Sequence, residues 1–200
     1  MTAQERAYFD ALVKDRVQNA DVMDKRSMRG LRQSVSEKYS DQAHFIYELL
    51  QNANDANAAS ARFVLLDDRL IFAHNGTKRF TVSNPETEDI DTENRTLGDL
   101  NSITSYANSN KYEASIGKFG VGFKAVFQYT ATPHIYDPKL FFRLDREIVP
   151  TELASDYPGR QKDETLFMFP FDHATRRKSE AYDDILEKLH TLDYPLLFLT

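Results

Sequence analysis

Between about residues 41 and 59, hydrophobic and polar positions alternate with the spacing of an α-helix. Three polar side chains share a narrow stripe: at roughly 100° per residue, Asn52 lies about 40° from Glu48, and Asp55 about 20° to its other side. Phe45, Ile46, Leu49, Leu50 and Ala53 are apolar, and Ile46, Leu49 and Ala53 centre on a direction more than about 100° from the stripe. We predict a helix that buries one flank in a core and directs a carboxylate, an amide and a second carboxylate into a cavity. A solvated polar face is the alternative interpretation of the stripe taken alone.

The patterns elsewhere in the chain predict further elements. Helices are expected at residues 4–18, 28–36, 97–107, 123–129 and 182–192. Apolar runs bounded by turn residues predict strands at 62–66, 69–73, 133–136, 140–144, 165–169 and 196–199. The first two strands and the second two are each expected to form a β-hairpin. Polar stretches at 77–96 and 150–163 are expected to be loops.

This order of elements predicts an α/β (α+β) two-layer sandwich, with a mixed, mostly antiparallel sheet and helices on one face. Two hundred residues suit one domain, 1–200, with residues 1–39 as an N-terminal helical extension. A domain seldom stops in an apolar strand such as the one expected at 196–199. We therefore expect the chain to be the N-terminal part of a longer protein.

Composition excludes several classes of function. The chain has no cysteine, which excludes disulfides, thiolate catalysis and cysteine-based metal centres. Its net charge of −6 argues against non-specific nucleic-acid binding by the whole surface. No apolar run approaches the roughly 20 residues that span a bilayer, and the N-terminus lacks the apolar core of a signal peptide. We expect a cytoplasmic protein without a membrane partner; a nucleic-acid partner is not evident, although the net charge does not exclude a local basic patch.

Two glycine-containing turns offer candidate binding chemistry. The strand at 69–73 ends in His74-Asn75-Gly76, where glycine permits a sharp turn and the close approach of a ligand. Further along, three glycines within residues 116–124 precede an amphipathic run. A glycine-rich turn that enters a helix presents free backbone N–H groups and the positive end of the helix dipole, which suits a phosphate. Tight packing of a turn is the alternative interpretation.

Together, the helix stripe and the glycine-rich loop resemble motifs of the GHKL ATPases, which include DNA gyrase, heat-shock chaperone ATPases, histidine kinases and MutL. Residues 48–56, E-L-L-Q-N-A-N-D-A, are similar to the family's E-x-x-x-N-x-x-D-A helix motif. Residues 116–123, I-G-K-F-G-V-G-F, are very similar to the phosphate loop of the chaperones. The amino-acid sequences of these motifs look closest to those of the sacsin-like branch. The resemblance covers roughly residues 40–170 and implies a Bergerat-type ATP-binding fold.

The resemblance implies a role for each polar residue of the helix. Glu48 would be the general base that activates the attacking water. Asn52 would be the protein ligand of Mg²⁺, which keeps several waters and bridges phosphates. Asp55 would order the adenine end of ATP and its neighbouring waters.

The resemblance also implies phosphate contacts and a lid. Backbone N–H groups of the loop would hold the β- and γ-phosphates, and the loop comprises Gly117, Lys118, Phe119, Gly120, Val121, Gly122 and Phe123. Lys118 or Lys124 would add positive charge or, equally, be a surface lysine. Residues 92–116 would be a lid that closes on nucleotide, with Ser109 and Lys111 touching phosphate.

The adenine end departs from the family pattern. The family places an aspartate before the glycine turn, to accept a hydrogen bond from the adenine amino group, whereas this chain has His74 and Asn75. Neutral His74 offers a ring nitrogen and Asn75 an amide oxygen as acceptors, and packing at the strand end is the alternative role for His74. Thr165 sits where the family places a threonine beneath adenine. The remaining histidines lack metal-ligand spacing, and they are His44, His134, His173 and His190.

The leading hypothesis from the sequence is Mg²⁺-dependent ATP binding and slow hydrolysis, coupled to lid closure and to dimerisation through this domain, within a larger chaperone-like or defence-type protein. The alternative is a nucleotide-gated interaction module with little or no hydrolysis. The missing aspartate favours that alternative. In the family, a basic residue from a following domain often completes the active site. Such a residue would lie beyond residue 200, and its absence from this chain also favours the alternative.

Overall fold

The computed structural model describes residues 1–28, 44–105 and 121–192. Its helical elements are α1 (Ala3–Met23), η1 (Arg26–Met28), α3 (His44–Asp55), η2 (Pro85–Thr87), α4 (Glu88–Glu93), α5 (Asp99–Ile103), η3 (Val121–Gln128) and α6 (Lys178–His190). Its strands are β1 (Ala61–Leu66), β2 (Arg69–His74), β3 (His134–Asp137), β4 (Leu140–Asp145), β5 (Val149–Glu152) and β6 (Thr165–Pro170).

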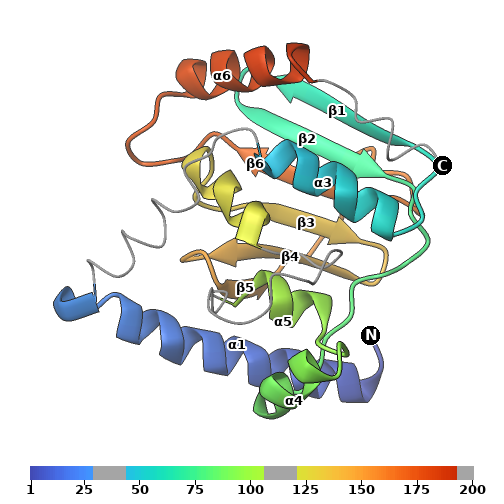
Figure 1. Cartoon of the computed structure of the whole chain (residues 1–200), viewed down its shortest axis with the longest axis vertical. Helices are drawn as coiled ribbons and strands as arrows, with labels where there is room; N and C mark the ends of the chain where they lie inside the picture. Colours follow the sequence, from blue (N-terminus) through green and yellow to red (C-terminus); the bar gives the residue numbers. More distant parts are fainter. Residues whose placement is uncertain (29–43, 106–120, 193–200) are drawn as a thin grey trace.

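The six strands form one open sheet in the order β1-β2-β6-β3-β4-β5, and every described pairing is antiparallel. Figure 1 shows α3, α5 and η3 in front of this sheet, with α6 near β1 and α1 along β5. The fold is therefore α+β, with a helical layer on one face of an antiparallel sheet. The predicted helices on one face are confirmed for the described residues.

The main core lies between the sheet and the helices. Alternate residues of the strands point toward the helices, among them Leu70, Phe72, Phe167 and Phe169, and all four are buried. The other face of the sheet carries a smaller apolar cluster built on Ile71, Ala73, Tyr136, Leu166 and Met168. Leu153 and Tyr157 from the β5–β6 connection cover that cluster in place of helices. Because successive side chains of a strand point to opposite faces of the sheet, only every second residue of each strand can face α3.

Helix α1 is fixed to the β5 end of the sheet by ion pairs. Its first turn has a capping box between Thr2 and Glu5. Arg6 forms a bidentate pair with Glu152, and Arg146 bridges Asp21 and Asp24 near the other end of the helix. Helix α1 is therefore attached to the sheet near both of its ends.

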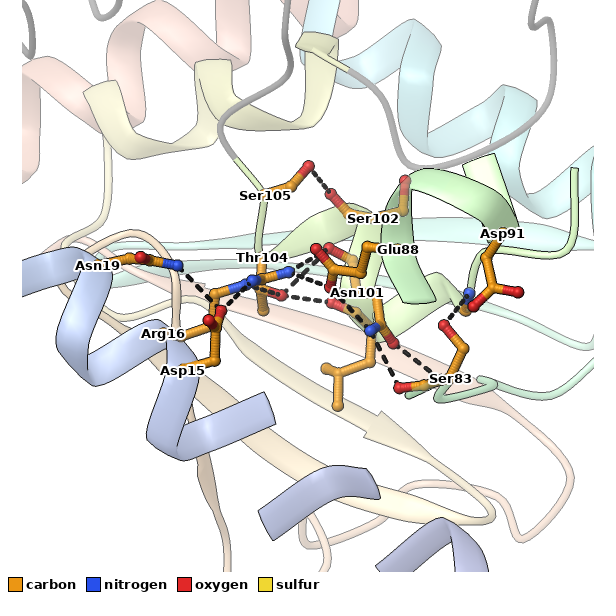
Figure 2. Close-up of polar contacts among 12 residues, drawn as sticks. Asp15, Arg16, Asn19, Ser83, Glu88, Asp91, Asn101, Ser102, Thr104 and Ser105 are labelled. Carbon is orange, nitrogen blue, oxygen red and sulfur yellow. Dashed lines mark hydrogen bonds and ion pairs between the residues drawn. The ribbon is translucent and has the colours of Figure 1, made fainter. Parts of the chain in front are cut away.

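A buried polar network joins α1 to α5 (Figure 2). The guanidinium of Arg16, whose side chain is 5% exposed, contacts the Glu88 carboxylate at 2.5 Å and the Thr104 hydroxyl at 3.1 Å. Asn101 also donates to Glu88, at 2.8 Å, and to the backbone carbonyl of Ser83. A buried arginine is tolerated because its charge and its donors are matched in this way.

Several sequence expectations are corrected by the structure. The sheet predicted as mixed is antiparallel across its described strands. Strand β5 was missed because Pro150 interrupts its pattern, and a proline is accommodated there because β5 is an edge strand. The acidic stretch at 77–96 predicts a loop, whereas residues 88–93 form α4, because acidic side chains in a first turn are favoured by the helix dipole.

One boundary and one helix type also differ. Helix α6 begins at Lys178, four residues before the expected start, because Arg177 and Glu180 cap it. The expected helix at 123–129 is a 3₁₀-helix, η3; so short an amphipathic pattern does not distinguish 3.0 from 3.6 residues per turn. Two predicted elements, most of the helix at 28–36 and the strand at 196–199, lie outside the described residues.

Candidate functional site

Helix α3 has the two faces that its sequence predicts. Phe45, Ile46, Leu49 and Ala53 are buried in the core. Glu48 is half-buried, Asn52 is 8% exposed and Asp55 is half-buried. The stripe is therefore not a solvated face, because its middle member lies inside the molecule.

Two polar atoms of this stripe lack hydrogen-bond partners. The Asn52 Nδ2 and the Asp55 Oδ2 are buried, and within the described part of the chain neither contacts a donor or acceptor. Leaving a buried polar group unpaired costs about 1–3 kcal/mol, and whichever way the Asn52 amide is turned, one of its polar atoms occupies that position. Such groups in a native fold call for an explanation, and a bound ligand is one.

The turn after β2 is packed against the end of α3. The Thr77 N–H donates to the Ala56 carbonyl at 2.8 Å. A Cβ at Gly76 would lie 2.6 Å from the Ala56 Cβ and 2.8 Å from its oxygen, so only glycine fits there. The Asn75 Oδ1 accepts from the N–H groups of Ala59 and Ser60, each at 2.9 Å. Asn75 thus uses its amide oxygen to hold the α3–β1 connection.

His74 ends β2 with its ring on the helical side of the sheet. Its Nδ1 accepts a hydrogen bond from the Gly76 N–H at 3.1 Å. Burial, reinforced by the nearby charge of Arg79, lowers the pKa of His74 to about 4. The neutral ring with an accepting Nδ1 carries its proton on Nε2, which makes Nε2 a donor.

Thr165 lies directly opposite His74, because β2 and β6 pair these two residues. Its hydroxyl donates to the Asp137 Oδ2 at 2.9 Å, and both side chains are buried. The backbone N–H groups of Lys139 and Phe80 also donate to Asp137. Desolvation raises the pKa of Asp137 from its ordinary value. His74, Thr165 and Asp137 therefore form a row across three neighbouring strands, on the face that α3 covers.

Asp137 is the residue of this row that the sequence did not reveal. In the motif Asp137-Pro138-Lys139 it was taken only as the first residue of a turn. Its position two residues after the buried Ile135 was the available signal, because residues two apart on a strand share a face. The pairing of β3 with β6, which no pattern in the sequence specifies, brings it beside Thr165.

The glycine-rich loop is described only at its end. Six predicted contacts lie outside the described residues: Ser109, Lys111, Gly117, Lys118, Phe119 and Gly120. Only the backbone of Val121 and Gly122 is described. Phe123 is 1% exposed and packs against Phe167 and Phe169 in the core. Within the predicted lid, residues 92–105 include α5, whose Leu100 and Ile103 are buried.

The ammonium group of Lys124 contacts two backbone carbonyls. Its Nζ donates to the carbonyls of Ile103 at 2.6 Å and Glu147 at 3.0 Å. Burial lowers the pKa of Lys124 to about 7; the nearby Arg16 lowers it further, while Glu147 opposes the shift. Lys124 therefore joins α5 to the β4–β5 turn, which leaves Lys118 as the remaining candidate for added charge at a phosphate.

The chain matches a family profile, that of the Sacsin domain, over residues 26–163. The match covers more than half of the 200 residues. The chain belongs to the Sacsin domain family. The matched part of this sacsin domain contains α3, the His74 turn and Asp137, and it ends just before Thr165. No curated protein matches the chain.

Other features of the sacsin domain bear on what the site can hold. No group of three or more metal-ligating side chains occurs among the described residues. A shallow hollow contains none of the stripe residues, and it is lined by Met1, Phe80, Thr81, Val82, Lys139 and Leu140. No helix in the described ranges is long and apolar enough to cross a membrane.

Proposed function

We propose that this sacsin domain binds ATP together with Mg²⁺ and hydrolyses it slowly, as a member of the GHKL ATPases with a Bergerat-type fold. The observation that carries the proposal is a set of two buried polar atoms on α3 that have no hydrogen-bond partner in the described part of the chain. Asn52 Nδ2 and Asp55 Oδ2 are buried, lie on one stripe with Glu48, and lack protein partners among the described residues. The stripe matches the family's acid–amide–acid motif, and in a family member that stripe faces the nucleotide.

The donor set of α3 fits a magnesium nucleotide. Mg²⁺ prefers oxygen ligands, keeps several waters and is held largely by substrate phosphates. The amide of Asn52 would supply one hard oxygen to the ion. Mg²⁺ would neutralise charge on the phosphates, and backbone N–H groups of the 117–123 loop would hold them.

Glu48 would act as the general base, one turn before Asn52 on the same stripe. Asp55 would stand at the adenine end, beside the His74 turn, which is packed against Ala56. His74 and Thr165 would lie beneath the base. Lid closure by residues 92–116, dimerisation and a chaperone-like or defence role in a longer cytoplasmic protein are further parts of the proposal, and they rest on the family resemblance alone.

The role of Glu48 is tested by substitution. In Glu48→Ala, and in Glu48→Gln as the isosteric form, we expect phosphate release to fall by about 10²–10⁴-fold, the usual contribution of a general base. ATP affinity should change little, because the base contacts water rather than nucleotide. Asn54→Ala is the matched control, since Asn54 is exposed on the same helix and lies off the stripe.

The two measurements together separate the competing functions. Calorimetry with ATP and Mg²⁺ reports binding, and a phosphate-release assay reports turnover. Undiminished release in Glu48→Ala would refute Glu48 as the base. Binding without release in the wild-type chain would favour the nucleotide-gated interaction module, and absence of binding would refute both functions.

A further inference from the structure

We propose that the docking of α1 regulates the nucleotide site, because α1 positions η3 relative to α3 through Arg16, α5 and Lys124. The inference rests on the proposed nucleotide binding and adds a regulatory element to that site. Helix α1 ends at Met23, whereas the match to the Sacsin domain begins at residue 26. The regulatory element therefore lies outside the part of the chain that the family profile matches.

Arg16 is the first link, and it joins α1 to α5. Its side chain is buried and extends from α1 toward the segment that contains α4 and α5 (Figure 2). Its Nε donates to the Thr104 hydroxyl at 3.1 Å, and a terminal nitrogen contacts the Glu88 carboxylate at 2.5 Å. The same nitrogen donates to the Asn101 carbonyl at 3.4 Å. A buried guanidinium needs such partners, so α1 and α5 cannot separate without losing them.

Lys124 is the second link, and it joins α5 to η3. Its Nζ donates at 2.6 Å to the carbonyl of Ile103, the last residue of α5. It also donates to the Glu147 carbonyl at 3.0 Å. Carbonyl groups at the C-terminal end of a helix carry partial negative charge, so a cation is favourable there. Arg16 contacts the Asn101 carbonyl in the same turn, so two cations from different elements hold one end of α5.

The third link is the packing of η3 against α3. Tyr129 directly follows η3, and its ring centroid lies 5.3 Å from that of Phe45 on α3. Phe123 of η3 is buried in the same core. The proposed phosphate-binding backbone at 121–123 belongs to η3. Binding groups that are already in position need less ordering when the ligand arrives, which increases affinity. A docked α1 should therefore favour nucleotide binding.

Ion pairs contribute an adjustable part of this docking. Arg6 and Arg146 form ion pairs near the two ends of α1, and the side chains of these pairs are 35–64% exposed. Salt screens exposed ion pairs. Of the 21 residues of α1, the buried ones are Phe9, Leu12, Arg16 and Ala20. Because this buried contact is small, we expect α1 to open more readily as the ionic strength rises.

Calorimetric titration of ATP with Mg²⁺ measures the regulation. We expect Arg16→Met to bind ATP at least about fivefold more weakly than the wild type, the lower end of typical coupling between sites. Arg6→Met is the matched control on the same helix, because its partner Glu152 lies on β5 and not on α5. The loss of this exposed pair should change the affinity by less than about twofold.

The outcomes of this titration separate the inference from the proposed function. Equal affinities of the wild type and Arg16→Met would overturn the inference and leave the proposed function standing, as would equal losses in Arg16→Met and Arg6→Met. Absence of binding to the wild type would overturn both. Lower stability alone does not change the affinity of the folded protein, so a purely structural role of Arg16 would leave the affinity unchanged.

Lys124→Met tests whether the links form one path. If Arg16 acts through Lys124, the double variant Arg16→Met/Lys124→Met should bind ATP no more weakly than the weaker single variant. Losses that multiply in the double variant would show that the two side chains act independently, and they would overturn the inference.

Reciprocity supplies a test in a chain that keeps Arg16. Because coupling between two sites acts in both directions, nucleotide binding should hold α1 more firmly. The chain has no cysteine, so Ala20→Cys introduces a single thiol at a buried position of α1 that packs against Ile148 and Val149. Ala181→Cys is the matched control, because Ala181 is buried on α6, which packs against β1 at the opposite edge of the sheet (Figure 1).

The rate at which a water-soluble reagent modifies each thiol reports how often its helix opens. ATP with Mg²⁺ should slow the modification of Ala20→Cys at least about fivefold more than that of Ala181→Cys. Without nucleotide, salt should accelerate the modification of Ala20→Cys more than that of Ala181→Cys. Equal slowing of both thiols by ATP would show global stabilisation alone, and no slowing at Ala20→Cys would show no coupling. Either result would overturn the inference, even if Arg16→Met does not fold.

Discussion

Asn52→Leu should make the ligand-free protein more stable, which is the opposite of the usual effect of changing a buried residue. Asn52 is 8% exposed, and its Nδ2 is buried without a partner among the described residues. An unpaired buried polar group costs about 1–3 kcal/mol. Leucine has a similar branched shape, so the substitution removes that cost without leaving a large cavity. A group kept for ligand binding rather than for stability is expected to behave in this way.

The matched control is Asn54→Leu, on the exposed side of the same helix. Both substitutions gain helix propensity, by about 0.5 kcal/mol, so their difference isolates the buried amide. We expect the unfolding free energy of Asn52→Leu to exceed that of Asn54→Leu by about 1–3 kcal/mol. For a domain of this size, each kcal/mol corresponds to a shift in Tm of about 2–4 °C.

Denaturant unfolding of the two variants and the wild type, without nucleotide, measures this difference. Chemical denaturation gives the free energies, and thermal scans give the shift in Tm. If Asn52→Leu is instead less stable than Asn54→Leu, the Asn52 amide contributes to the fold, and the argument that it awaits a ligand is wrong.

Two further predictions concern the buried polar groups around α5. Arg16→Met should lower the unfolding free energy by about 1.5–3 kcal/mol, because the partly buried Glu88 carboxylate loses its charged partner and keeps the neutral Asn101 donor. Arg6→Met, at an exposed pair with Glu152, should cost less than about 1 kcal/mol. Comparable losses in the two variants by denaturant unfolding would contradict the structural role of Arg16. Lys124 has a folded pKa of about 7, below its unfolded value of 10.5, so the unfolded state holds more protons between these pH values and stability rises with pH across that window. From pH 7 to 9.5 the unfolding free energy of the wild type should rise by about 3 kcal/mol relative to that of Lys124→Met, at 1.36 kcal/mol per pKa unit. Parallel pH profiles of the unfolding free energy for the two proteins would refute the lowered pKa of Lys124.

The helix and the hairpins could be predicted because their signals are local. The spacing of Glu48, Asn52 and Asp55 fixes one stripe on any α-helix. The two hairpins follow from apolar runs separated by short turns, and the pairings of β1 with β2 and of β3 with β4 confirm them. The sacsin-like identity followed from the same local motifs and is confirmed by the match to the Sacsin domain.

The rest depends on contacts between residues distant in the chain. The row formed by His74, Thr165 and Asp137 exists because β6 is inserted between β2 and β3, and no local pattern specifies that insertion. The direction of Lys124 depends on carbonyls 21 and 23 residues away. The sequence leaves both His74 and Asn75 as acceptors for adenine, and only the fold shows that the Asn75 oxygen accepts from the α3–β1 connection beside it. Binding of ATP and Mg²⁺ and the roles of the glycine-rich loop stay predictions.

Calorimetric titration of ATP with Mg²⁺ into the wild type, Asn52→Leu and Asn54→Leu tests the central claim most directly. The account predicts saturable binding at one site for the wild type and for Asn54→Leu. Asn52→Leu should lose that binding while it remains folded and more stable. Absence of binding to the wild type, or equal binding to all three proteins, would contradict the claim that the buried stripe of α3 is the wall of an ATP site.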